Sequence, residues 1–281
     1  LLAQGLKLGV NFIDTAEQYR TYPYIRAALT LADCPGDIVI ATKTFAESAA
    51  DAAYALEEAR LQLCRNQLDI FLLHEVRDEA DFAARGEAWQ VLRQAKANGV
   101  IKALGISTHS AATAAWAAAR PDLDVLHPML NFSGVGILDG NVQDMLAAIS
   151  AAKAAGIGVF TMKALGGGAL MHQAKAALDW AFSRPELDAV AVGCKDISEL
   201  ATNIGWLLGE TPPEAEQVKL LDRNIAFDKE PRCHGCGACV RRCANGAMMI
   251  GEDGTAHWQK DKCLYCGYCI AACPWFCISF C

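Results

Sequence analysis

Short apolar runs alternate with alanine-rich amphipathic stretches along the first 210 residues. The amphipathic stretches predict helices at Ala49–Leu63, Phe82–Asn98, Gln143–Ala155 and Lys175–Phe182. Strands that are apolar throughout and alternate with helices are typical of a parallel sheet buried on both faces. The runs that predict strands are Val10–Asp14, Ile38–Lys43, Leu68–His74, Ile101–Ser107, Val125–Asn131, Ile157–Lys163 and Ala189–Gly193.

The seven strand–helix units are one short of a (β/α)8 TIM barrel. The chain opens on Leu2–Leu8, which has the pattern of the end of a helix. We therefore expect an α/β barrel that lacks its first strand, with about 40 residues upstream in a complete protein. A remnant barrel and an open, doubly wound sheet are the alternatives.

Composition narrows the class of protein. Hydrophobic residues make up 53% of the 281 residues, so a large core can be buried. The net charge of -7 argues against nucleic acid or an anionic membrane as the partner. No apolar run is long enough to span a membrane and no secretion signal opens the chain, so we expect a cytoplasmic protein.

The cysteines follow a repeat near the C-terminus. The chain has 13 cysteines, most of them after residue 232. Two C-x2-C-x2-C-x3-C motifs are offset by 30 residues. Two zinc sites are the alternative, but zinc takes four ligands and the motifs would waste cysteines, so iron–sulfur chemistry is favoured. The motif cysteines are Cys233, Cys236, Cys239, Cys243, Cys263, Cys266, Cys269 and Cys273.

This segment resembles the bacterial-type ferredoxins, in which the fourth cysteine of each motif ligates the other cluster. The resemblance implies two [4Fe–4S] clusters. One would be held by Cys233, Cys236, Cys239 and Cys273, and the other by Cys263, Cys266, Cys269 and Cys243. Cys34, Cys64 and Cys194 are expected to be buried core thiols, while Cys277 and Cys281 have no predicted role.

The chain divides into three parts. Residues 1–210 are the predicted barrel and residues 211–230 a linker. A connecting helix over Glu210–Phe227 is expected there, opened by Pro212 and Pro213. Residues 231–281 are the predicted ferredoxin-like domain, a small α+β unit.

Polar residues follow three neighbouring predicted strands, where a barrel gathers its active site. Asp14, Lys43 and His74 end the first three strands, and Tyr19 lies in the first loop. A buried lysine would favour the tyrosine phenolate, and an aspartate would compensate the ammonium. Taken singly, the aspartate is more typical of a helix cap and the histidine of the core. Together the four predict a tyrosine general acid.

The phrases NFIDTAEQY, ATKT and LLHE resemble the aldo-keto reductase superfamily over about residues 1–210. The similarity is strongest to the bacterial and archaeal branch with a C-terminal ferredoxin-like region. It implies that Tyr19 protonates a carbonyl oxygen while NAD(P)H delivers hydride, that Lys43 and Asp14 tune Tyr19, and that His74 orients the substrate.

The same resemblance implies nucleotide contacts. Ser107 and Asn131 would bind the nicotinamide carboxamide, although His127 replaces the family's glutamine. Met162 would stack on the nicotinamide, and Glu199 favours NADH over NADPH because a carboxylate repels a 2′-phosphate; Lys195 nearby could reverse this. The residues implied for pyrophosphate and adenosine are Lys163, Leu165, Gly167, Gly193 and Asn203.

Hydride transfer moves two electrons, whereas each cluster moves one. Three functions therefore stay open: a carbonyl reductase with an iron–sulfur appendage, a relay to an external electron carrier, and an idle barrel that carries clusters. The four residues at the strand ends favour the first two, because buried charges without a function are costly. The expected partners are a small carbonyl substrate and a nicotinamide nucleotide.

Overall fold

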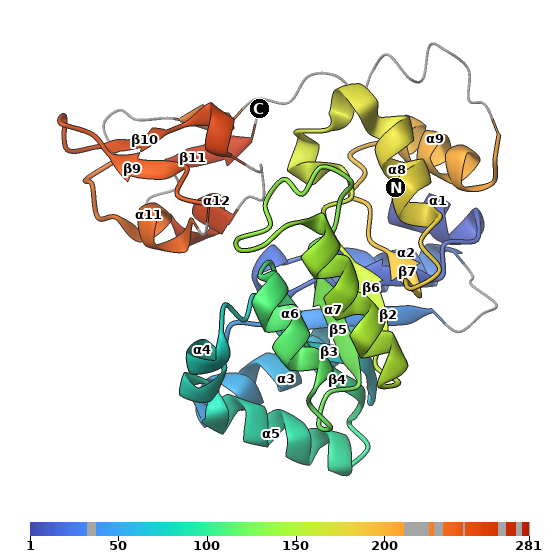
Figure 1. The fold of residues 1–281 in the computed structure, drawn as a ribbon. Coiled ribbons are helices and arrows are strands. Elements are labelled where there is room, and N and C mark those ends of the chain that lie inside the picture. The colour runs from blue at the N-terminus through green and yellow to red at the C-terminus, as the bar shows by residue number, and fades with distance from the viewer. Residues whose placement is uncertain are drawn as a thin grey trace.

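Seven parallel strands form the main sheet, and each is hydrogen-bonded to the next strand in sequence (Figure 1). Consecutive order confirms a barrel-type sheet and excludes the doubly wound alternative, in which the order reverses at a switch point. Among the strands that the structure describes, β1 and β7 do not pair with each other. The strands are β1 (Phe12–Asp14), β2 (Val39–Thr44), β3 (Leu68–Leu73), β4 (Ile101–Thr108), β5 (Val125–Pro128), β6 (Gly158–Thr161) and β7 (Ala189–Val190).

The computed structural model describes most of the chain. The described ranges are 1–32, 38–210, 225–227, 233–243, 245–263, 268–273 and 277–280. Cys34, Cys266, Cys281 and most of the predicted connecting helix therefore lie outside the described residues. No helix in the described ranges is long and apolar enough to cross a membrane.

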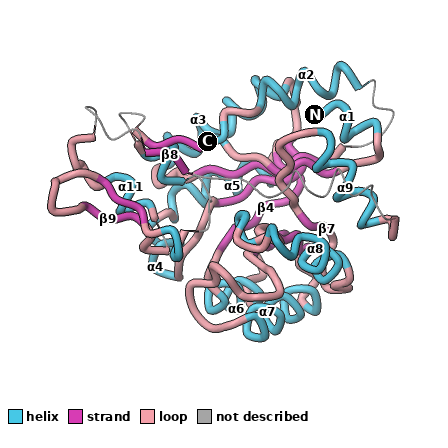
Figure 2. The backbone as a smooth tube through the Cα atoms, turned by 90° about the horizontal axis from the view of Figure 1, so that it is seen from above, coloured by secondary structure: helices cyan, strands magenta, loops and turns pink. Residues whose placement is uncertain are grey.

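Helices lie around the outside of the strands (Figure 2). Side-chain caps begin several of them: Ser48 accepts from the Asp51 amide, and Asn141 and Asp144 cap each other. The helices of this part are α1 (Leu2–Lys7), α2 (Tyr22–Ala32), α3 (Ala49–Leu63), α4 (Glu79–Ala84), α5 (Gly86–Ala97), α6 (Ala111–Ala118), α7 (Val142–Ala154), α8 (Ala174–Phe182) and α9 (Ile197–Leu207), with 3-10 turns η1 (Glu17–Tyr19), η2 (Gly166–Gly168) and η3 (Met171–Gln173).

The sequence prediction of one helix over Phe82–Asn98 is wrong, because the chain is interrupted at Arg85 between α4 and α5. The buried Arg85 guanidinium donates to the carbonyl oxygens of Thr44, Ala46 and His74. Thr44 ends β2, Ala46 lies in the loop after it, and His74 directly follows β3. Arg85 thus leaves the regular helix surface and ties together two strand ends that carry the site.

The core has two layers. Phe71 and Leu73 of β3 belong to the cluster between sheet and helices. Ile70 and Leu72, which alternate with them, pack with Phe160 in the barrel interior. This alternation explains why the strand is apolar at every position.

The last three predicted strands are shorter than expected. β5 ends at Pro128, which has no amide hydrogen to donate, so Asn131 lies in the following loop. β6 ends at Thr161, and Lys163 has a positive φ of 62° that extended chain does not adopt. The predicted site residues of these strands are therefore loop residues.

In the described residues from 225 onward, two small antiparallel sheets and two short helices form the C-terminal part. β8 (Ile225–Phe227) pairs with β11 (Ile278–Phe280), and β9 (Met248–Ile250) pairs with β10 (Ala256–Trp258). The predicted connecting helix is wrong at Ile225–Phe227, because these residues gain backbone partners in β11. Figure 1 shows this part beside the barrel. Its helices are α11 (Ala238–Arg242) and α12 (Tyr268–Ala272), with a 3-10 turn η5 (Lys260–Lys262).

Candidate active site and iron–sulfur segment

The four residues predicted as the catalytic group meet at the ends of β1, β2 and β3. Lys43 is 1% exposed, and its Nζ donates to Asp14 Oδ1 at 2.6 Å and to the Thr15 carbonyl oxygen at 2.7 Å. The same Nζ lies 5.3 Å from the centroid of the Tyr19 ring. The Tyr19 and His74 rings meet edge to face, with centroids 5.8 Å apart.

Burial and charge set the protonation states. Burial lowers the pKa of Lys43, and the adjacent Asp14 carboxylate opposes this by favouring the ammonium. Burial, followed by the Lys43 charge, lowers the pKa of His74 well below its ordinary value. The site therefore offers a neutral imidazole that can make a directed hydrogen bond.

Local structure positions Tyr19. It ends the 3-10 turn η1, and Arg20 closes that turn in the left-handed region. The side chain of Glu17 on the same turn accepts from Thr44 Oγ1 at 2.6 Å. Because Thr44 follows Lys43 on β2, this bond anchors the turn that carries the phenol to the strand that carries the ammonium.

His127 is fully buried next to the catalytic group. Its Nδ1 donates to the Phe160 carbonyl oxygen at 2.8 Å, and its Nε2 lies 3.8 Å from Asp14 Oδ1. Complete burial lowers the pKa of His127 to about 4. The imidazole is therefore neutral near pH 7, and its long contact with Asp14 is not an ion pair.

A groove of about 790 Å³ joins the catalytic group to the predicted nucleotide segments. Its lining includes Asp14, Tyr19, Met162, Gly193 and Asn203, together with residues of α1, β1 and β7, so it takes in the space between the edge strands β1 and β7. A hollow of about 160 Å³ adjoins it. The predicted residues that line this hollow are Lys163, Leu165, Gly167, Gly193, Glu199 and Asn203.

The other predicted contacts have partners within the chain. Ser107 is fully buried, and its Oγ accepts from the Glu75 amide at 2.8 Å. The Asn131 side chain accepts from Val135 N and donates to Val135 O, so it closes its own loop. Glu199 Oε2 accepts from the Lys195 amide at 2.7 Å. Their nucleotide roles stay predictions.

Sequence reasoning missed the residues that cover the catalytic group. Tyr268 of α12 places its hydroxyl 3.0 Å from His74 Nε2. The Arg242 guanidinium of α11 lies 3.2 Å from Glu75 and 3.5 Å from the centroid of the Phe45 ring. No local pattern signals these contacts, since both helices lie more than a hundred residues beyond their partners in the chain.

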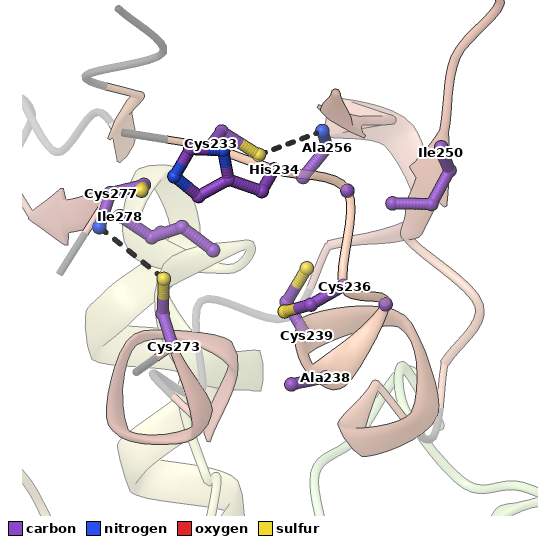
Figure 3. A pocket seen from close by; sticks show the side chains of 12 residues that line it. Cys233, His234, Cys236, Ala238, Cys239, Ile250, Ala256, Cys273, Cys277 and Ile278 are labelled. Carbon is purple, nitrogen blue, oxygen red and sulfur yellow. Dashed lines mark hydrogen bonds between the residues drawn. The ribbon is translucent and has the colours of Figure 1, made fainter. Parts of the chain in front are cut away.

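Four cysteines from the two motifs surround one hollow in the C-terminal part (Figure 3). They are the set that the ferredoxin resemblance implies for one cluster: Cys233, Cys236, Cys239 and Cys273. The Ala256 amide donates to Cys233 Sγ and the Cys277 amide to Cys273 Sγ, each at 3.3 Å. Amides directed at sulfur stabilise thiolate ligands, so this donor set fits an iron–sulfur cluster.

The second predicted set is described in part. Cys243 Sγ accepts from the Ala247 amide at 3.2 Å, whereas Cys266 lies outside the described residues. Within the described ranges, no three histidine, cysteine or acidic side chains gather closely enough to hold one metal ion. The four cysteines of a [4Fe–4S] cubane each bind a different iron, so they do not have to converge on a single metal ion.

Comparison with known families agrees with this geometry. A model of the aldo/keto reductase family matches residues 1–175. The chain belongs to the aldo/keto reductase family. A second model, a 4Fe-4S dicluster domain, matches residues 225–274. This member of the aldo/keto reductase family therefore also carries a 4Fe-4S dicluster domain.

Curated relatives match the two parts separately. The NADPH-dependent alpha-keto amide reductase of Saccharomyces cerevisiae is 32% identical over 38% of this chain and 36% of its own length. The formate dehydrogenase iron–sulfur subunit of Haemophilus influenzae is 31% identical over 34% of this chain and 30% of its own length. The chain thus spans about a third of each of these relatives.

Solved structures share the fold. Aldo-keto reductase AKR11C1 from Bacillus halodurans, in its holo form, has a TM-score of 0.61 with 18% identity, over 79% of this chain and 86% of its own. An aldo-keto reductase of the silkworm Bombyx mori has a TM-score of 0.56 with 17% identity, over 78% of this chain and 75% of its own. At these identities the likeness concerns the fold alone.

Proposed function

We propose that this aldo/keto reductase reduces an aldehyde or ketone with NAD(P)H, with Tyr19 as general acid, and that it carries two [4Fe–4S] clusters. The ion pair of the buried Lys43 with the partly buried Asp14, next to the Tyr19 ring, carries this proposal. Keeping an ammonium in the barrel costs free energy that the Asp14 carboxylate offsets, and this charge adjoins the phenol that would lose a proton.

Each residue of the group has one task. Tyr19 Oη gives its proton to the carbonyl oxygen, and the Lys43 ammonium stabilises the phenolate that is left. Asp14 keeps Lys43 charged inside the barrel. The neutral His74 orients the carbonyl oxygen through a hydrogen bond. The nucleotide supplies the hydride when it is bound.

The groove supports the nucleotide part of the proposal. Its lining reaches from Met162, which would face the nicotinamide, to Asn203, which would face the adenine. The backbone at Leu165 and Gly167 would hold the pyrophosphate, and Ser107 would donate to the carboxamide. Glu199 lines the hollow beside Asn203, and its carboxylate favours NADH because it repels a 2′-phosphate.

A relay of electrons to or from an external one-electron carrier is the second candidate. It is favoured by the contact between His74 and Tyr268, because Tyr268 directly precedes the predicted cluster ligand Cys269. The curated relatives of this segment include iron–sulfur subunits of formate dehydrogenases. Either activity suits a reducing compartment such as the cytoplasm.

The test is anaerobic oxidation of NADH and of NADPH with a set of aldehydes and ketones, by protein with and without its clusters. We expect carbonyl-dependent oxidation, faster with NADH, that falls by about a hundredfold or more in Tyr19→Phe, the range of lost general acid catalysis. Intact turnover in Tyr19→Phe would overturn the assignment. Turnover that survives cluster removal unchanged would exclude the relay.

A further inference from the structure

The hydrogen bond between Tyr268 and His74 places a residue of the iron–sulfur segment inside the predicted carbonyl site. Tyr268 is 4% exposed, and its hydroxyl lies 3.0 Å from His74 Nε2. An imidazole nitrogen makes one hydrogen bond in its plane, either as N–H donor or as lone-pair acceptor. A carbonyl oxygen therefore cannot bond to Nε2 while the Tyr268 hydroxyl does.

The phenol ring lies in a space that aromatic and cationic groups define. The His109 ring is nearly parallel to it, with centroids 6.3 Å apart and an interplanar angle of 17°. The Phe45 ring meets it edge to face at 6.2 Å, and the His74 ring does so at 5.5 Å. Lys163 Nζ lies 5.8 Å from the centroid of the ring. We call this space, bounded by Phe45, His74, His109 and Lys163, the ring slot.

One side of the ring slot is formed by the polar His109 ring. His109 is buried, and neither of its ring nitrogens has a hydrogen-bond partner within the described ranges. Burial lowers the pKa of His109 to about 3, so the imidazole is neutral. A neutral ring that stacks on a ligand and still offers one donor and one acceptor suits a flat molecule with a polar substituent.

Two anchors hold Tyr268 in place, and both adjoin the same predicted cluster. Tyr268 precedes Cys269, and Arg242, which lies over the Phe45 ring, precedes Cys243. These cysteines belong to one implied ligand set. Tyr268 therefore reaches the ring slot from the chain segments that carry the ligands implied for the second cluster, and barrel residues contact it there.

We infer that the ring slot is the binding site for the aromatic ring of an aryl aldehyde or ketone, and that Tyr268 occupies it in the absence of substrate. This inference rests on the proposed carbonyl reduction. The substrate ring takes the place of the Tyr268 ring, and the carbonyl oxygen takes the place of its hydroxyl at His74. Entry of the substrate requires Tyr268 to leave, so the iron–sulfur segment competes with substrate for the site.

The experiment compares the full-length, cluster-containing protein with Tyr268→Ala, Tyr268→Phe and the control Tyr54→Ala, which removes a tyrosine that is 66% exposed. In Tyr268→Ala we expect kcat/KM for benzaldehyde to rise about tenfold, because the slot is open. For butanal, which has no ring, the rise stays about threefold or less. Tyr268→Phe keeps the ring and loses one hydrogen bond, so both aldehydes gain about threefold.

Calorimetric binding of p-cresol gives a readout that does not depend on turnover. We expect p-cresol to bind Tyr268→Ala with at least about tenfold higher affinity than it binds the unmodified protein or Tyr54→Ala. Toluene, which lacks the hydroxyl, binds the same variant about fivefold more weakly than p-cresol. If neither the unmodified protein nor any variant reduces an aldehyde but p-cresol still binds in this pattern, the proposed function is wrong. The binding of an aromatic ring in the ring slot is then still supported.

Other outcomes overturn the inference. Equal gains in kcat/KM for benzaldehyde and butanal in Tyr268→Ala would show that Tyr268 obstructs the site but that the ring slot does not bind a substrate ring. A loss of activity in Tyr268→Phe with full cluster absorption would make Tyr268 a positioning residue and not a competitor. If Tyr268→Ala loses its clusters, the test rests on Tyr268→Phe. No gain in kcat/KM for either aldehyde in Tyr268→Phe would then refute the competition between Tyr268 and substrate.

Discussion

Replacing Asp14 by Asn tests whether the carboxylate keeps Lys43 charged inside the barrel. The Nζ–Oδ1 distance is 2.6 Å, for which Coulomb's law at an effective dielectric constant near 20 gives about 6 kcal/mol. Breaking a buried ion pair by removing one member costs about 3–5 kcal/mol in practice. The Asp14 side chain is 18% exposed and Asn keeps an acceptor oxygen, so we expect the lower end, about 3 kcal/mol.

The pH dependence has a definite sign. Burial lowers the pKa of Lys43 in the folded state below its ordinary value of 10.5, and removal of Asp14 lowers that pKa further. Between the folded and unfolded pKa values, only the unfolded chain binds the proton. The free energy of unfolding of Asp14→Asn should therefore rise with pH up to about 10.5, over a wider window than in the unmodified protein.

Chemical denaturation at a series of pH values measures this effect. The double variant Asp14→Asn with Lys43→Met is the control, because it removes the ammonium that Asp14 compensates. We expect the double variant to regain most of the lost stability and to have no carbonyl reduction. A loss of unfolding free energy below about 1 kcal/mol in Asp14→Asn would refute the proposed role of the carboxylate. A double variant that is no more stable than Asp14→Asn would refute it as well.

Three further changes follow from other contacts. Arg85→Met should lose about 3 kcal/mol in thermal unfolding, because three buried carbonyl oxygens lose their donor, whereas the exposed Arg93→Met should change stability little. His109→Leu should stabilise the protein by about 1 kcal/mol, by removing two unpartnered nitrogens. That gain should grow as pH falls from 6.5 toward the folded pKa of about 3, since only the unfolded histidine is protonated there; a flat profile would contradict this. Cys273→Ser should halve the iron content per chain, whereas Cys277→Ser, whose amide still donates to Cys273, should retain it; equal iron in both would argue against the implied ligand set.

The fold was largely predictable because its signals are local. Strands that are buried on both faces must be apolar throughout, and β3 shows this at every position from Leu68 to Leu73. Charged and polar residues are costly to bury at the ends of such strands unless they are used, so Asp14, Lys43 and His74 could be predicted from their order. Predictions failed where distant contacts decided the conformation, as at Arg85, whose acceptors lie at the ends of β2 and β3.

The predicted nucleotide contacts show the same limit. Gly167 and Asn203 line one hollow. Asn131 bonds within its own loop, a detail that depends on the turn after β5 and not on its position in a motif. A motif specifies which residue type is available, but the local backbone decides where its hydrogen bonds go.

Sequence alone determined that the chain is an α/β barrel with three polar residues at neighbouring strand ends, a tyrosine in the first loop and a duplicated cysteine motif, since each feature follows from residue spacing. Only the tertiary structure showed that the iron–sulfur segment reaches into the barrel, where Tyr268 meets His74 across 194 residues of chain. The reason is physical: spacing reports the periodicity of one element, whereas contact between two separately folded parts depends on how their surfaces fit.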